Sequence, residues 1–439
     1  MRLAWVVPTL ALLAGHAVVA QQPLAGGRRP DSLRLTALYD EAAHRDPRQR
    51  QLQLQAAQTD LRLRNIAAER FPIVGAEGQS QYQSDVTTVP IQGPGGQRPP
   101  SPPHDTYDAR LVAQEQLLDP TRAPRRAVER AQLAEAQAQV RVSLFTLRPD
   151  VNEAFFAAAA LQERVAQIEA TISDLETRQR EAGARVREGA SLPSDTALLD
   201  VLILQRRQDV AELRAGRRAA LGRLAQLIGR ALDEADVLVL PDLAAAVAEA
   251  RASLSDVRGR PEYEQFAGTR DRLARQSDVI ASRERPRVTA FARLGYGKPG
   301  LNMLSNTFDA YWLAGVQVQW TPWTWGGVDR EREALALQQQ IVAANEAAFT
   351  ESLRRAIQTD LATLDRLDST LVLDDRIIAL RERIEHETRV RLQEGVVTSA
   401  EYVNRNTELL QARLARSSHL VELVQTRARF LTTLGLEIR

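Results

Sequence analysis

The feature that most constrains the fold of this chain is an internal duplication. Residues 185–189 (RVREG) recur as residues 391–395 (RLQEG). Four further pairs lie at the same separation: Val151 and Ile357, Ile172 and Ile378, Asp195 and Glu401, and Gly229 and Gly435. Chance does not produce such a set in one register, so the sequence predicts two structural repeats, 31–240 and 241–439, that together form one domain.

Each repeat is expected to contain a helix, a strand, a loop, a second strand, a long helix, a tight turn and a returning helix. The strands are predicted in four segments in which apolar and polar residues alternate: 71–83, 106–118, 286–297 and 310–321. A period of two is typical of strands with one apolar face and one solvent-facing side. The stretch 86–104, rich in proline and glycine, is expected to be a long loop, and 298–308 is its shorter counterpart.

The rest of the chain is typical of long packed helices, because it is rich in Ala, Leu, Gln, Arg and Glu and aromatic residues make up only 5%. Apolar residues recur with heptad spacing at Leu161, Val165, Ile168, Ile172 and Leu175. The seam in the second repeat is interrupted by Asp360 and Asp374. Pro149 is expected to kink or interrupt the helix predicted over 125–187, whereas its counterpart is Arg355, so the two halves need not bend alike.

Four strands in one chain cannot close a barrel, which needs about eight strands even to fill its own interior. Open strand edges are not tolerated in lipid, because their N–H and C=O groups find no water there. Strands that reach a membrane must therefore be completed by identical neighbours, and three copies give twelve strands. The helices are expected to continue this ring as a helical barrel, with an ordinary coiled-coil stalk as the alternative.

Four of the five tryptophans lie close together, at Trp312, Trp320, Trp323 and Trp325. Tryptophan rings favour the boundary between membrane and water, where the ring is buried and the N–H stays wet. We therefore interpret these residues as a membrane girdle. A core cluster and a sugar-stacking platform are the alternatives.

The N-terminal twenty residues are predicted to be a signal peptide. Arg2 is followed by a mostly apolar stretch, 3–13, and small residues at 18–20 precede Gln21. No other segment approaches the roughly 18 uninterrupted apolar residues that a membrane-spanning helix needs. The chain has no cysteine, which excludes disulfides and thiolate metal sites. Its 57 basic and 56 acidic residues argue against a broad nucleic-acid-binding surface.

No catalytic constellation is found in the sequence. Beyond the predicted signal peptide the four histidines, at 44, 104, 386 and 419, lack the spacing of metal ligands. There is no G-x-S-x-G motif, and Gly295 and Gly297 lie in a predicted strand without the following helix that a phosphate-binding loop requires. We expect a protein that is not an enzyme and that carries no cofactor or metal.

Several short motifs, in this order and in duplicate, carry a resemblance to a known family. They are 35–42 (LTALYDEA) with 46–47 (DP), 70–72 (RFP), 117–119 (LLD), 320–322 (WTP) with 326–327 (GG), the two Glu-Gly turns, and 434–436 (LGL). Over nearly its whole length the chain resembles the TolC-like outer-membrane efflux proteins, also called outer-membrane factors. The resemblance implies a mainly α-helical trimer with a transmembrane twelve-stranded β-barrel above a periplasmic tunnel of twelve helices.

The resemblance also implies a location and partners. The protein would reside in the bacterial outer membrane, with a large periplasmic portion. It would form the exit duct of a tripartite efflux or type I secretion system, together with a periplasmic adaptor (membrane fusion) protein and an inner-membrane transporter. Neither the cargo (a drug, a metal ion or a secreted polypeptide) nor the class of pump is indicated by the sequence.

Candidate site residues lie at the two Glu-Gly turns. The resemblance makes these tips the periplasmic entrance and the docking surface for the adaptor, formed by six residues: Gly189, Ala190, Ser191, Gly395, Val396 and Val397. In known members the last of these positions is basic or polar. Glycine suits a tight turn because it tolerates positive φ.

Asp195 and Glu401 follow the turns at equivalent positions, in the first part of the returning helix. In a ring they would form a negative collar that favours cations. The alternative is that Asp195 only caps its helix, with Ser194 as a second candidate cap. Asn404 stands where known family members often have a second carboxylate, which argues against assuming a tightly closed entrance.

Two other classes of protein remain open from the sequence. One is an exported periplasmic coiled-coil adaptor, and the other is an exported helical structural protein without a pore. Neither class requires two matched pairs of alternating strands or a cluster of tryptophans.

Overall fold

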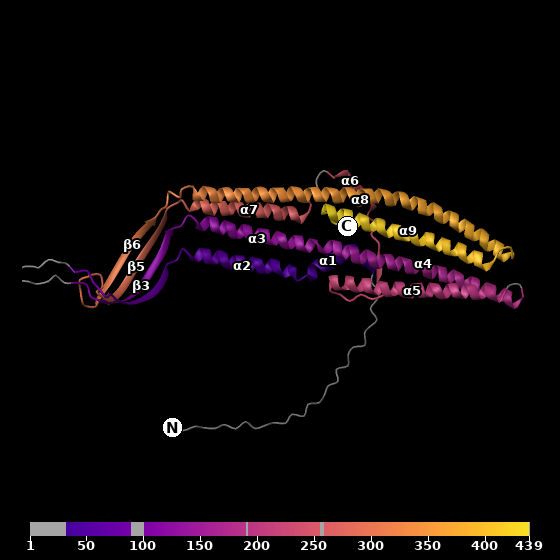
Figure 1. Cartoon of the computed structure of the whole chain (residues 1–439), viewed down its shortest axis with the longest axis horizontal. Helices are drawn as coiled ribbons and strands as arrows, with labels where there is room; N and C mark the ends of the chain where they lie inside the picture. Colours follow the sequence, from indigo (N-terminus) through magenta and orange to yellow (C-terminus); the bar gives the residue numbers. More distant parts are fainter. Residues whose placement is uncertain (1–31, 89–100, 190–191, 255–258, 439) are drawn as a thin grey trace, which may run out of the picture.

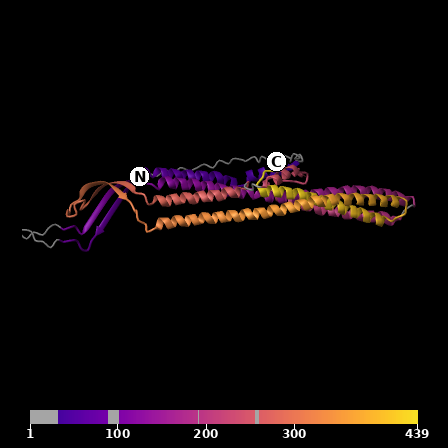
Figure 2. The ribbon, with the colours of Figure 1, turned by 90° about the horizontal axis from the view of Figure 1, so that it is seen from above.

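A computed structural model describes residues 32–88, 101–189, 192–254 and 259–438. The predicted signal peptide lies outside these ranges. The molecule is elongated, with a β-sheet at one end and long helices running away from it (Figure 1). Viewed from above, the helices form a thin, extended bundle (Figure 2). Among the helices in the described ranges, none combines the length and the apolar character needed to cross a lipid bilayer.

The sheet contains four antiparallel strands in the order β2-β3-β5-β6. They are β2 (Ile73–Tyr82), β3 (Asp105–Leu118), β5 (Arg287–Lys298) and β6 (Asp309–Gln319). The four predicted strands are therefore confirmed. The register pairs Leu111 with Leu294 and Leu294 with Trp312, which places the apolar residues of neighbouring strands on one face. The outer edges of the sheet, β2 and β6, have no partner strand among the described residues.

Next to the sheet, four helices lie side by side in the order α2, α3, α7 and α8. Their bounds are Arg48–Ala68, Arg122–Phe145, Pro261–Ser282 and Gly327–Gln393. Farther from the sheet the order is α5 (Pro193–Ile228), α4 (Leu147–Arg187), α9 (Ser399–Leu434) and the second part of α8. The sheet, the helices next to it and the helices farther away form three successive layers along the molecule, and all three have the same order. Elements of the first half of the chain lie on one side, and elements of the second half lie on the other.

The predicted effect of Pro149 is confirmed. Helix α3 ends at Phe145 and α4 begins at Leu147, so Pro149 lies in the first turn of α4. No intrahelical hydrogen bond requires its missing N–H at that position. In the second half, where Arg355 takes its place, α8 runs without a break for 67 residues. The two halves differ in this respect, as their sequences indicate.

The two aspartates that interrupt the apolar seam of α8 are matched by basic residues of α9. Arg429 donates a hydrogen bond to Asp360 (Nε to Oδ1, 2.7 Å), and the ring of His419 contacts Asp374 (Nδ1 to Oδ2, 2.6 Å). Both carboxylates are buried between the helices. Arg429 and His419 themselves are partly exposed at the edge of this contact. Because a buried carboxylate without a hydrogen-bond partner is unfavourable, these contacts favour one register of α8 against α9.

The main hydrophobic core lies halfway along the bundle, where α4, α5, α8 and α9 meet the short elements of the chain. These elements are β1 (Ser32–Arg34), α1 (Leu35–Arg45), β4 (Val237–Val239) and α6 (Ala244–Ala252), and β1 pairs in parallel with β4. At the centre of the core, Phe155 packs edge to face on Phe156 with ring centroids 5.1 Å apart, and both rings are fully buried.

A series of buried hydrogen bonds crosses this core. The hydroxyl of Tyr39 donates to the Oδ1 atom of Asn152, and the amide of Asn152 donates to Oγ1 of Thr432 (3.3 Å). Burial raises the pKa of Tyr39 to about 12, so its hydroxyl remains a hydrogen-bond donor at neutral pH. These hydrogen bonds join α1, α4 and α9.

Candidate functional site at the two ends of the protomer

The two Glu-Gly turns lie together at the end of the bundle that is farthest from the sheet (Figure 1). One turn joins α4 to α5 and the other joins α8 to α9. Gly189 and Gly395 both have a φ of 75°, a conformation that residues with a side chain rarely adopt. The predicted tight turns are therefore confirmed at both glycines. Ala190 and Ser191 lie outside the described residues.

The equivalent carboxylates behave differently in the two tips. The carboxylate of Asp195 accepts a hydrogen bond from the backbone N–H of Leu192 (3.3 Å) at the start of α5. Asp195 therefore makes the capping contact, and the suggestion that Ser194 is the cap is wrong, because Leu192 occupies the N-cap position and Ser194 lies inside the helix.

In the second tip, the cap is Thr398. Its hydroxyl accepts a hydrogen bond from the N–H of Glu401 (3.3 Å). The carboxylate of Glu401 makes no hydrogen bond or ion pair with any residue in the described ranges, and its side chain and that of Asn404 are exposed. Thr398 was not predicted as a cap, although the spacing S/T-x-x-E over 398–401 is the signal of a capping box. Only the threonine half of a capping box is formed here, because the carboxylate of Glu401 does not reach back to the N–H of Thr398.

The two hairpins are tied together just behind their tips. The guanidinium of Arg185 on α4 donates to the backbone oxygens of Leu392 (3.3 Å) and Gln393 (2.7 Å) at the end of α8. These oxygens belong to the last turn of the helix, where a cation is favoured, and the oxygen of Leu392 also accepts from the backbone N–H of Gly395 (3.1 Å). Arg185 therefore adds a contact from the neighbouring hairpin to this helix end. A cavity of about 700 Å³ lies between the tips, and Asp195, Arg185 and Tyr402 contribute to its lining.

Tyr402 forms a second tie between the hairpins. Its ring is fully buried, and its hydroxyl donates to the carboxylate of Asp174 on α4 (3.4 Å). Burial, together with the nearby charges of Asp174 and Glu385, raises the pKa of Tyr402, so the hydroxyl stays protonated and keeps donating. Neither Arg185 nor Tyr402 was predicted, because both contacts join residues that are more than 200 positions apart.

We expect Arg185→Met to loosen the tips. The substitution keeps most of the aliphatic stem but removes two charged hydrogen bonds, and a loss of about 1.4 kcal/mol in local stability corresponds to about tenfold more opening. Limited proteolysis at the two turns should therefore be about tenfold faster. Arg187→Met is the matched control, because Arg187 lies in the same last turn of α4 and is exposed. Equal cleavage of both variants would show that the tie does not hold the tips.

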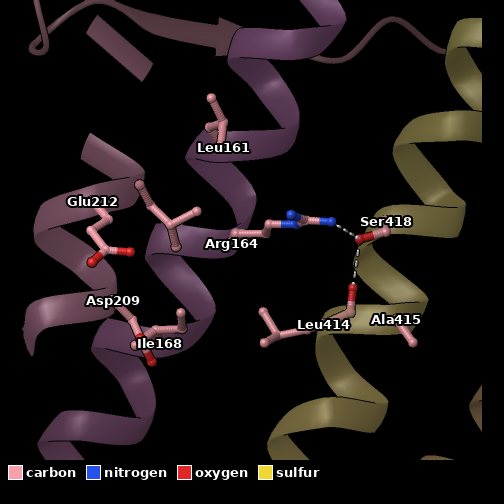
Figure 3. A pocket seen from close by; sticks show the side chains of 9 residues that line it. Leu161, Arg164, Ile168, Asp209, Glu212, Leu414, Ala415 and Ser418 are labelled. Carbon is pink, nitrogen blue, oxygen red and sulfur yellow. Dashed lines mark hydrogen bonds between the residues drawn. The ribbon is translucent and has the colours of Figure 1, made fainter. Parts of the chain in front are cut away.

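A groove runs over α4 between α5 and α9 (Figure 3). Its floor is apolar, with Leu161 and Ile168, and its cavity measures about 500 Å³. On one side the guanidinium of Arg164 donates to the hydroxyl of Ser418 (3.2 Å), which donates in turn to the backbone oxygen of Leu414 (2.9 Å). The first of these hydrogen bonds links α4 to α9, and the second lies within α9. In the part of the chain that the structure describes, no group of His, Cys, Asp or Glu side chains could hold a metal ion.

At the sheet end, the four tryptophans are exposed in the protomer. Trp312 lies near the start of β6 and is 74% exposed, and Trp320 directly follows the strand and is 61% exposed. At about 3.3 Å per residue, these two positions lie about 26 Å apart along the strand. Trp323 and Trp325 continue the group at the end near the helices, with ring centroids 6.1 Å apart. The tryptophans do not form a core cluster in the protomer.

Other aromatic residues gather around Trp312, at the end of the sheet that is distant from the helices. Phe308 stacks on Tyr107 and on Tyr296, with ring centroids 6.1 and 5.7 Å apart. Between the two aromatic groups the same face of the sheet carries exposed apolar side chains, including Val316 and Val318. The Nε1–H of Trp320 donates to the backbone oxygen of Glu284 (2.9 Å), so its polar group is satisfied while its ring faces outward.

The chain thus has one four-stranded antiparallel sheet at the end of a long helical bundle, and each half contributes two strands and a pair of long helical segments. No family model and no curated protein sequence matches the chain. Three solved structures that share its fold are CusC, VceC from Vibrio cholerae and MtrE from Neisseria gonorrhoeae.

The likeness to each of them extends over most of both chains. CusC is 15% identical with a TM-score of 0.66, over 92% of this chain and 92% of CusC. VceC is 14% identical with a TM-score of 0.63, over 92% of this chain and 97% of VceC. MtrE, described as an outer membrane channel in its open state, is 17% identical with a TM-score of 0.63, over 92% of this chain and 89% of MtrE. The chain shares the fold of these three proteins, which confirms the mainly helical architecture with a four-stranded sheet at one end that the resemblance implied.

Proposed function

We propose that the protein is the protomer of a homotrimeric outer-membrane channel, the exit duct of a tripartite efflux or type I secretion system. The observation that carries this proposal is the apolar face of the sheet, bounded by aromatic groups about 26 Å apart along the strands. Membrane barrels of this kind carry an outward apolar band about 25 Å tall between two aromatic girdles. Trp312 would belong to one girdle, and Trp320, Trp323 and Trp325 to the other.

The open edges of the protomer support closure into a ring. One side of all three layers is formed by β2, α2 and α5, and the other side by β6 and α8. The heptad stripe on α8 that faces away from α9 has four exposed apolar residues: Leu373, Ile377, Leu380 and Ile384. The corresponding stripe on α5 is Ala197, Val201, Leu204 and Ala211. A head-to-tail contact between these sides buries both stripes and pairs β6 with the β2 of the next protomer, and three copies give twelve strands.

We treat 31–240 and 241–439 as two structural repeats of this single domain. Support comes from the order of elements, since a helix, two strands, a long helix and a returning helix occur in each half. With Pro149 interrupting only the first long helix, the repeats are similar but not equivalent.

At the other end, the tips would form the periplasmic entrance. An adaptor would dock on Gly189, Ala190 and Ser191 in one tip and on Gly395, Val396 and Val397 in the other, and would link the channel to an inner-membrane transporter. Exposed apolar side chains at Leu192 and Val396 support a contact surface there. Asp195, Glu401 and Asn404 would line the entrance, where the free carboxylate of Glu401 would contribute most of a negative collar.

The test is the ion selectivity of the purified protein in planar lipid bilayers. We expect the wild type to conduct, and Glu401→Gln combined with Asp195→Asn to lower the ratio of cation to anion permeability by about twofold or more, because six carboxylates leave the collar. Glu401→Gln alone should produce most of this shift. Glu249→Gln, an exposed position on α6, removes the same type of charge away from the tips and is the control.

Two results would contradict the proposal. A protein that stays monomeric and soluble without detergent would favour the coiled-coil adaptor. A trimer that inserts into bilayers without conducting would favour a structural role.

A further inference from the structure

A hydrogen-bonded chain crosses the polar face of the sheet from β6 to β2. The hydroxyl of Tyr311 donates to Oδ1 of Asp108 (2.6 Å), and Oδ2 of Asp108 accepts from Arg110 (3.0 Å). Arg110 also donates through Nε to the carboxylate of Glu77 (2.7 Å). The ring of Tyr311 can span β5 only because Gly295 lies beneath it, where a Cβ atom would be 2.4 Å from the ring. The charge of Arg110 is therefore fully paired.

Arg293 lies on the same polar face, two residues before Gly295 on β5, in the next row of cross-strand neighbours toward the helices. Its guanidinium forms no ion pair with the described residues. The register places it beside Val112 of β3 and Leu313 of β6, and Val112 is followed by Gly75 of β2. Arg293 is thus the only charged residue in its row. Its guanidinium lies over the ring of Phe291, 5.9 Å from the centroid, and has no carboxylate partner in the described ranges. Its Nε atom is buried and makes no hydrogen bond there.

The space in front of this guanidinium is open. A cavity of about 270 Å³ lies on the polar face, and Arg293, Leu313 and Leu301 line it. Its lining also includes Lys298 and the paired Arg110 and Asp108, so basic groups outnumber the carboxylate there. A guanidinium offers a planar fork of donors that matches the two oxygens of a carboxylate or phosphate group. Apolar neighbours strengthen such an interaction, because they keep the local dielectric low.

We propose that Arg293 determines specificity in the channel by favouring solutes with anionic oxygen groups. The inference rests on the proposed function, because a trimer whose apolar face meets lipid brings three copies of Arg293 to the inner wall. There they form a cationic ring with an apolar rim. This ring opposes in sign the acidic collar proposed at the tips, and rings of charged side chains set the preference of a pore for anions or cations.

The experiment measures the reversal potential of the purified full-length trimer in planar bilayers under a potassium chloride gradient. Arg293→Gln should raise the ratio of potassium to chloride permeability by about twofold or more, and Arg293→Glu should raise it further. Arg293→Lys should leave the ratio close to that of the wild type. The shift should be opposite in sign to that of Glu401→Gln.

A relocation variant controls for indirect effects. Leu313 is the cross-strand neighbour of Arg293, so Arg293→Gln with Leu313→Arg moves the charge to the next strand within the same row. The double variant should recover the reversal potential of the wild type. An unchanged reversal potential in Arg293→Gln, with normal conductance, would overturn the role of Arg293. Absence of conductance in the wild type would overturn the channel function itself.

Discussion

Ile377→Glu combined with Leu380→Glu on α8 is expected to abolish the trimer. In the protomer these side chains are 47% and 50% exposed, and in the proposed ring they pack against the next protomer's α5. Two carboxylates per interface, repeated three times, would be buried without partners, and each unpaired buried charge costs several kcal/mol. Size-exclusion chromatography with light scattering in detergent should show monomers in place of trimers, and channel conductance should be lost.

The matched control is Ala379→Glu with His386→Glu. Both positions are exposed on α8 but lie off the apolar stripe, so the same number of carboxylates is introduced on the same helix. This control should remain trimeric. If the stripe variant also stays trimeric, α8 does not form the contact between protomers.

Phe155→Ala is expected to destabilise the protein by about 3–5 kcal/mol, as truncation of a buried aromatic residue does when the cavity cannot collapse. Phe155 is fully buried at the centre of the core and packs edge to face on Phe156. The loss should appear in guanidinium-induced unfolding followed by far-ultraviolet circular dichroism. Because unfolding of a trimer depends on protomer concentration, variant and wild type are compared at the same concentration.

Phe155→Leu serves as the graded control, since it retains more of the buried volume and should lose clearly less stability. Equal losses in the two variants would indicate that the ring contact with Phe156, which both variants lack, accounts for the effect, and that the buried volume retained by leucine contributes little. A loss below about 1 kcal/mol in Phe155→Ala would show that the core repacks around the missing ring.

Much of the fold was predictable because its signals are local. Period-two alternation marked all four strands of the sheet, and Pro149 marked the break between α3 and α4. In contrast, β1 and β4 were not predicted, because strands of three residues are too short to show a period. Their pairing joins positions more than 200 residues apart, which depends on the packing of the bundle and not on the local sequence.

The candidate site residues also divide into those with a local sequence signal and those that depend on contacts between distant elements. The glycines of the turns were predicted from residue type, because a positive φ is a local requirement. The different behaviour of Asp195 and Glu401 depends on which neighbour caps the helix, and the motif at Thr398 was readable but missed. The ties made by Arg185 and Tyr402, and the isolation of Arg293, depend on partners brought from other elements. No single-sequence pattern encodes them.

The unequal continuity of the two long helical paths has a mechanical consequence. The 67 residues of α8 form one rod about 100 Å long, which carries a push or twist at its far end directly to the strand that precedes it. The path through α3 and α4 has a joint at Thr146, where a similar movement can be absorbed as a change of angle. A load applied at the tips is thus transmitted stiffly along one flank of each protomer and compliantly along the other.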